Sequence, residues 1–123
     1  MRDVPELNKV VAEIADHEGR LDGLIAAAGI QQETAALEYS AEDANRMFEI
    51  NITGVFMTAQ AAAKQMIRFG KGGSIVLIAS MSASVANKVC FADCSLNFVT
   101  KSVCVNGVSD RTLGVDLSSV QRL

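Results

Sequence analysis

Apolar residues recur at helical spacing early in the chain and are followed by a short continuous apolar run. Asp3 can cap a helix whose first turn accepts Pro5, and Gly19 marks the end of that helix. The stripe between them consists of Leu7, Val10, Val11, Ile14 and Ala15. The next run, "LDGLIAAAGI", is flanked by glycine and is too short for a second buried helix. We therefore expect a strand over residues 24–27 with both faces covered.

The middle of the chain predicts a long helix and then a second strand. Ser40 can open the helix by accepting a hydrogen bond from the amide of Asp43. The apolar stripe that follows is Phe48, Ile52, Val55, Phe56, Ala59, Ala63, Met66 and Ile67. A helix over residues 41–69 would be on the order of 40 Å long, so we expect a kink near residues 51–54. "KGGSIVLIAS" then supplies a glycine turn and a β-branched strand over residues 74–79.

This order of elements, helix, buried strand, long helix and buried strand, predicts an α/β fold with a parallel sheet. One polar residue interrupts the apolar side of the long helix. In "FEINITGVF", Asn51 and Gly54 occupy packing positions. A buried amide must be hydrogen-bonded, and a nearby backbone carbonyl is the simplest partner.

Composition excludes several classes of protein. The chain has 123 residues and a net charge of −3, with acidic and basic residues interspersed, so neither a nucleic acid nor a membrane is indicated as a partner. No apolar run reaches the length of a membrane span, and the charged start "MRDVPELNKVV" lacks the apolar region of a secretory signal, so we expect a cytoplasmic protein. The three cysteines lie far from the single histidine, which makes a zinc site improbable and favours reduced thiols.

The stretches "LDGLIAAAGI", "FEINITGVF" and "GGSIVLIAS" occur in an order and at separations that resemble the middle of a classical short-chain dehydrogenase/reductase. The resemblance covers residues 4–88. It implies part of a Rossmann-type, doubly wound parallel sheet that binds NAD or NADP. The reaction it implies is hydride transfer at a small alcohol or carbonyl substrate.

The resemblance assigns roles to particular residues. The family's Asn-Asn-Ala-Gly segment corresponds to residues 26–29, with both asparagines replaced, and it places Ala27, Ala28 and Gly29 against the cofactor. Asn51 corresponds to the asparagine at a helix kink that helps to hold a water in the proton relay. Ser80 corresponds to the serine that hydrogen-bonds the substrate oxygen, with Ser82 and Ser84 as nearby alternatives. The alternatives from the residues alone are tight packing for "AAAG", a structural amide for Asn51, and a turn serine for Ser80.

The sequence departs from the family at the proton-transfer residues. The family requires Tyr-x-x-x-Lys somewhat more than a dozen residues after its serine, and the single tyrosine of this chain is Tyr39. Lys101 stands four residues after Asn97, but neither Asn97 nor Phe98 can act as a general acid. The family's glycine-rich phosphate loop would lie upstream of Met1. We therefore expect no dehydrogenase activity from this chain alone.

The chain divides at residue 88 on this interpretation. Residues 1–88 form a partial NAD(P)-binding domain, and residues 89–123 form an irregular tail that is either a divergent terminus or the product of an altered reading frame. A small hairpin around Asn106 and Gly107 is one prediction within the tail. Two strands without their usual neighbour would leave an apolar edge that promotes association. A non-catalytic module that binds full-length relatives or its own copies through the long helix is an alternative, as is a fragment that does not fold.

Overall fold

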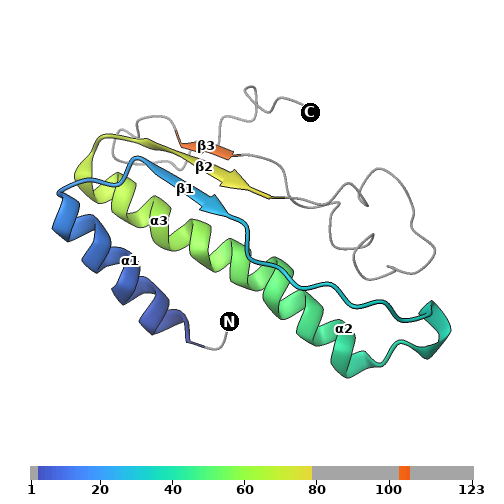
Figure 1. Ribbon diagram of the computed structural model, residues 1–123. Coiled ribbons are helices and arrows are strands. Elements are labelled where there is room, and N and C mark those ends of the chain that lie inside the picture. Colours follow the sequence, from blue (N-terminus) through green and yellow to red (C-terminus); the bar gives the residue numbers. More distant parts are fainter. Residues whose placement is uncertain (1–2, 79–102, 106–123) are drawn as a thin grey trace.

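The computed structural model describes residues 3–78 and 103–105 (Figure 1). In chain order the elements are α1 (Val4–Glu18), β1 (Gly23–Ala26), the short 3-10 helix η1 (Ala36–Glu38), α2 (Ala41–Phe48), the π-helical segment η2 (Glu49–Gly54), α3 (Val55–Phe69), β2 (Gly73–Leu77) and β3 (Val103–Val105). The predicted order of helix, strand, long helix and strand is confirmed, and so is the α/β class.

The first helix begins and ends where the sequence signals predict. The Asp3 side chain accepts a hydrogen bond from the amide of Glu6 at 2.9 Å, and Pro5 lies in the first turn. Gly19 follows the last turn with φ 66°, a left-handed conformation that glycine adopts without steric cost. The side chain of Ala15 is fully buried, so this helix packs through a narrow stripe of small and medium-sized residues.

The predicted long helix is a continuous helical column made of three segments. Ser40 caps α2, because its hydroxyl accepts from the amide of Asp43 at 3.0 Å. Where the sequence predicts a kink, near residues 51–54, the structure has the π-helical segment η2, in which the helix is locally wider than an α-helix. Gly70 ends α3 with φ 67°.

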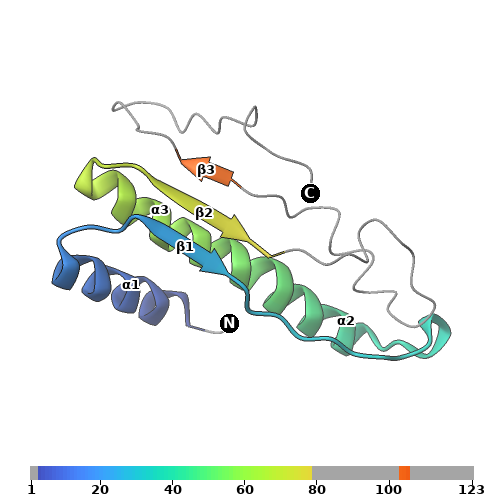
Figure 2. The same ribbon diagram turned by 45° about the horizontal axis from the view of Figure 1, so that its top comes forward.

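The sheet combines one parallel and one antiparallel pair. β1 pairs with β2 in parallel, with Leu24 opposite Ile75, and β3 pairs with β2 in the antiparallel direction (Figure 2). The expectation of two strands followed by an irregular tail is therefore corrected by β3. This strand falls on the first arm of the hairpin predicted around Asn106 and Gly107, but it pairs with β2. The turn of that predicted hairpin lies outside the described residues.

The prediction that β1 has both faces covered is wrong for the residues that the structure describes. α1 and α3 lie on the same face of the sheet, so the alternating side chains of β1 meet different surroundings (Figure 1). Ala26 points toward the helices and is buried, whereas Ile25 points to the other face and is 70% exposed. A continuous apolar run predicts a strand but does not distinguish one covered face from two.

The core lies between α3 and the sheet. Met66, Ala62 and Ile75 are its buried centre, and the partly buried hydrophobic residues around them are Leu21, Leu24, Ala59, Ala63 and Leu77. Gly73 at the start of β2 lies directly against Met66, since a Cβ atom at Gly73 would overlap the Met66 sulfur. In the described part of the chain, no helix has both the length and the apolar character required to cross a bilayer.

Candidate functional site

The candidate site lies at the carboxyl end of β1, where the chain leaves the sheet through residues without large side chains. Ala27, Ala28 and Gly29 follow the strand directly and all three are exposed. Gly29 does not have a positive φ, and a Cβ atom there would meet the Asn51 Oδ1 atom at 3.5 Å, an ordinary contact. The fold therefore does not itself require glycine at this position. Its small size keeps the outer surface of the turn accessible, as a ligand lying on the backbone requires.

Asn51 holds this turn from the helix. Its Oδ1 atom accepts from the Ile30 amide at 2.9 Å, and its Nδ2 atom donates to the Ile30 carbonyl, also at 2.9 Å. One side chain thus satisfies both backbone groups of a residue 21 positions away. The partner is therefore not the local helix carbonyl that the residues alone suggested. Asn51 retains one N–H and one oxygen lone pair for a further partner, such as a water.

The π-helical segment brings Asn51 to this position. η2 runs from Glu49 to Gly54 and follows α2 without a break. Just beyond it, the Thr58 hydroxyl donates to the Gly54 carbonyl at 2.8 Å and so supplies a donor to a backbone acceptor at the end of the widened turn. Segments of this kind are frequent at functional sites, because they turn a side chain away from the regular helical stripe.

A second polar connection holds the segment after the turn. The Ser40 hydroxyl donates to Asp43 Oδ2 at 2.7 Å. Hydrogen bonds from Ser40 and from the Gln32 side chain lower the pKa of Asp43, so this carboxylate is ionised at neutral pH. The Gln32 side chain also lies 3.3 Å from the Thr34 hydroxyl. The pairing of Ser40 with Asp43 was expected from the sequence, whereas nothing in the sequence pointed to Gln32.

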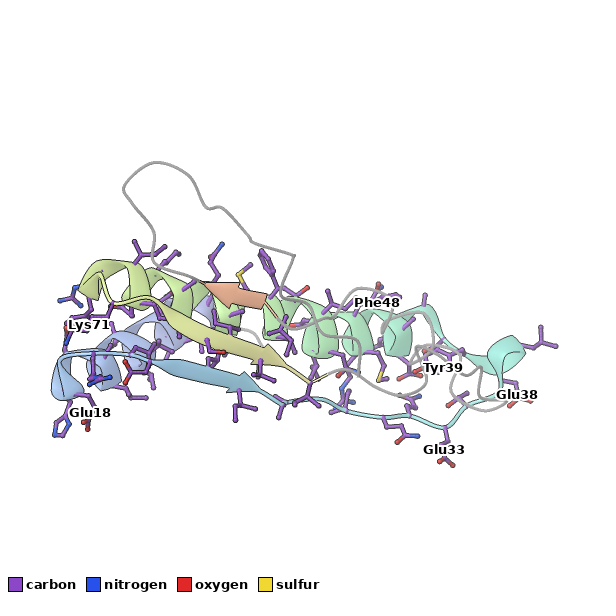
Figure 3. The ribbon with its side chains drawn as sticks, turned by 90° about the horizontal axis from the view of Figure 1, so that it is seen from above. Glu18, Glu33, Glu38, Tyr39, Phe48 and Lys71 are labelled. Atoms are coloured by element: carbon purple, nitrogen blue, oxygen red, sulfur yellow. The ribbon has the colours of Figure 1, made fainter. Side chains whose placement is uncertain are left out.

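An apolar contact supports the same segment from below. Met47 of α2 is buried, and the side chains of Ile30, Tyr39 and Ile52 pack against it. Figure 3 shows Tyr39 beside α2, at the return of the connection from Glu33 and Glu38 to the helix. Ile30 is thus held by its side chain as well as by its backbone. Sequence reasoning missed this residue, because its importance comes from its partners and not from its type.

Several predicted residues lie outside the described part of the chain. These are Ser80, its alternatives Ser82 and Ser84, and the positions Asn97, Phe98 and Lys101. Of the predicted site residues, the structure brings together Asn51 and Gly29, and it places Ala27 and Ala28 in the same turn. Among the residues that it describes, no group of three metal-binding side chains is present.

Comparison with known proteins identifies the family. The sequence model of the family described as short chain dehydrogenase matches residues 1–92. The chain therefore belongs to the short-chain dehydrogenase/reductase family, an oxidoreductase family whose cofactors are NAD and NADP. The resemblance found in the three sequence motifs is confirmed.

Individual relatives agree with this assignment. The chain is 38% identical over 78 residues to L-rhamnose 1-dehydrogenase (NAD(P)(+)) of Sphingomonas sp. strain SKA58, a match that covers 63% of this chain and 31% of the relative. It is 43% identical over 75 residues to 2-dehydro-3-deoxy-D-gluconate 5-dehydrogenase of Escherichia coli strain K12, covering 61% and 28%. This chain thus spans about a third of the length of either enzyme.

The structure also resembles solved members of the family. A short-chain dehydrogenase from Mycobacterium paratuberculosis, crystallised with NAD, superposes with a TM-score of 0.75 at 33% identity, and the match covers 79% of this chain and 36% of that one. The described elements are therefore a portion of a Rossmann-type domain.

Proposed function

We propose that this chain forms one part of the NAD(P) site of a short-chain dehydrogenase/reductase acting on a small alcohol or carbonyl, and that it does not transfer hydride by itself. The observation that carries the proposal is the pair of hydrogen bonds from Asn51 to Ile30. They fix an exposed turn of small residues at the carboxyl end of a parallel strand, where α/β folds bind nucleotides.

The residues present fit a dinucleotide at this turn. Ala27, Ala28 and Gly29 would contact the cofactor through their backbone, since all three are exposed and none carries a large side chain. NAD(P) supplies the hydride acceptor or donor of the reaction when it is bound. Asn51 would position the turn and hold a relay water with its remaining N–H or lone pair, and Ser80 would hydrogen-bond the substrate oxygen.

The chain lacks a residue for proton transfer at the expected place. Its single tyrosine is Tyr39, which packs against Met47 beside α2. An amide such as Asn97 does not exchange the proton that the reaction requires. General acid–base catalysis typically contributes about 10²- to 10⁴-fold in rate, so its loss alone would leave little activity.

Cofactor contact can be tested without turnover. We expect NADPH or NADH, added at millimolar concentration, to shift the amide resonances of residues 27–30. Gly29→Ala should weaken these shifts, because its methyl group adds bulk to the turn 3.5 Å from Asn51 Oδ1, the atom that accepts from the Ile30 amide. Gly23→Ala, the same change on β1, is the matched control. Unchanged resonances in the turn at saturating cofactor would contradict the proposal.

Activity is tested separately. The two relatives are named for L-rhamnose and 2-dehydro-3-deoxy-D-gluconate. Sugars and sugar acids, including these two, are therefore the first substrates to assay. We expect no steady consumption or production of NADPH or NADH with either. Turnover that disappears in Ser80→Ala would refute the predicted inactivity while supporting the site.

A second candidate function is association through the long helix. Phe48, Phe56 and Ile67 are exposed along α2 and α3, and Figure 3 shows Phe48 on the side of α2 away from the connection that carries Glu33. Apolar side chains repeated along one helix are typical of a helix-on-helix interface. Phe56→Lys should abolish co-purification with a full-length relative or self-association, and unchanged association would exclude this surface.

We also propose that the protein is cytoplasmic and has no nucleic acid or membrane partner. The odd number of cysteines suits a reducing compartment, and the mixed charge distribution offers no basic surface for such partners.

A further inference from the structure

The strand β3 covers one edge of β2 with residues from the C-terminal part of the chain. It runs antiparallel to β2, with Ile75 opposite Val103, and lies on the side of β2 away from β1 (Figure 2). The preceding elements alternate helices and strands, and the two strands among them pair in parallel. β3 does not continue that pattern, so its position on this edge requires a separate explanation.

The backbone groups of β2 point alternately toward its two neighbours. The Ser74 amide donates to the Asp22 carbonyl at 2.9 Å, so Ser74 directs its backbone toward the strand β1. Because this direction alternates along a strand, Gly73, Ile75 and Leu77 direct their N–H and C=O groups away from β1. β3 lies opposite the first two of these three residues. Its backbone therefore pairs with groups that an open edge would offer to another chain.

The segment behind this edge is well suited to pairing between chains. Residues 73–79, "GSIVLIA", contain no charged residue and no proline, and three of the seven are β-branched. Short, uncharged segments of high β-propensity associate when their edge is open, and native proteins cover such edges. β3 supplies a cover of this kind from within the same chain.

A second copy of β2 is the occupant that fits the uncovered edge. In an antiparallel pair centred on Ile75, the two Ile75 residues would exchange both backbone hydrogen bonds, and Gly73 of each copy would pair with Leu77 of the other. The same two-fold rotation, about an axis perpendicular to the sheet, keeps both copies of α3 on one face of the joined sheet. β3 occupies the place that the second copy would take.

We propose that β3 is an autoinhibitory strand: by pairing with β2, it prevents two copies of this chain from joining their sheets through the β2 edge. The segment expected from the sequence to be an irregular tail then has a physical role, whatever its origin. The inference holds whether or not the chain binds a nucleotide, because it involves the opposite edge of the sheet from the turn at residues 27–30 and none of its residues.

The test compares proline variants of β3 in the whole chain, by sedimentation equilibrium over a range of concentrations with a reducing agent present. Val103→Pro removes the N–H that faces the Ile75 carbonyl. It should raise the self-association constant about tenfold, roughly the effect of one backbone hydrogen bond. Cys104→Pro is the matched control, because its N–H points away from β2 and an edge strand accepts proline on that side. It should leave the constant unchanged, and association through the long helix contributes equally to every variant.

A peptide added in trans separates release of the edge from general unfolding. The peptide KSVCVNG, residues 101–107, should return Val103→Pro to the association constant of the parent chain. The same peptide with N-methyl groups at Val103 and Val105 should not. In the associated state the Leu77 amide should exchange more slowly, because the second copy pairs with it and β3 does not reach it.

Three results would overturn the proposal. They are an unchanged association constant in Val103→Pro, an equal rise in Cys104→Pro, and association that the unmethylated peptide does not reverse.

Discussion

The two ends of the long helical column stabilise the molecule in different ways. α3 packs on the sheet through small and flexible apolar residues, with Ala62 and Met66 buried and Gly73 directly against the methionine. α2 and the π segment instead hold a connection through directed hydrogen bonds, chiefly those of Asn51. One end is a close-packed core, and the other is a polar support for a turn that must remain accessible. The effects of substitutions at the two ends on stability should therefore differ in magnitude and in physical cause.

The largest effect is expected at the packed end. Met66→Ala removes a fully buried side chain between α3 and β2 and should lower the free energy of unfolding by about 2 to 5 kcal/mol. Urea denaturation followed by circular dichroism measures the change. Ile67→Ala, at the neighbouring exposed position, is the control and should cost much less. Equal losses would mean that α3 does not pack as described.

Gly73→Ala tests the same contact from the sheet. The new methyl group would overlap the Met66 side chain, which is fully buried, so we expect a loss of about 1 to 3 kcal/mol. Gly23→Ala is the control, because its Cβ atom would lie 3.7 Å from the Ser74 carbonyl oxygen, an ordinary contact distance. Combining Gly73→Ala with Met66→Ala should cost less than the sum of the two changes. Strict additivity would argue against the contact.

Asn51→Leu probes the polar end. It leaves the N–H and C=O groups of Ile30 without their partner, and it should destabilise the chain by roughly 1 to 3 kcal/mol, toward the lower value because water can reach the partly buried turn. Amide exchange at Ile30 should accelerate more than exchange in β2. An unchanged denaturation midpoint would show that the amide has no structural role.

The smallest effect concerns pH. The pKa of Asp43 is lowered in the folded chain, so its contribution to stability is present above the unfolded pKa, about 4, and is lost as the pH falls through the folded value. Denaturation midpoints from neutral to acid pH should therefore decline less steeply in Asp43→Asn. Glu42→Gln, in the same helical turn, keeps the bond to Ser40 and should retain the slope. A decline unaffected by Asp43→Asn would contradict this assignment.

The packed end was largely predictable from the sequence, and the polar end only in part. Helical spacing identified Met66 and Ala63, and the cap at Ser40 set the start of α2, because these signals are local. Asn51 was conspicuous as an amide in an apolar stripe, but its partner Ile30 is 21 residues away and is chosen by tertiary structure. The same limit applies to Ile25, whose exposure depends on which helices cover the sheet.

The π segment also has a consequence for insertions and deletions. A π turn closes i→i+5 hydrogen bonds and so holds one residue more than an α turn. Deleting one residue from η2 would let the column continue as a regular α-helix with the faces of α2 and α3 kept, but it would remove the widened turn from which Asn51 reaches Ile30. A gap of a single residue, harmless in most surface loops, would here dismantle the support of the candidate site.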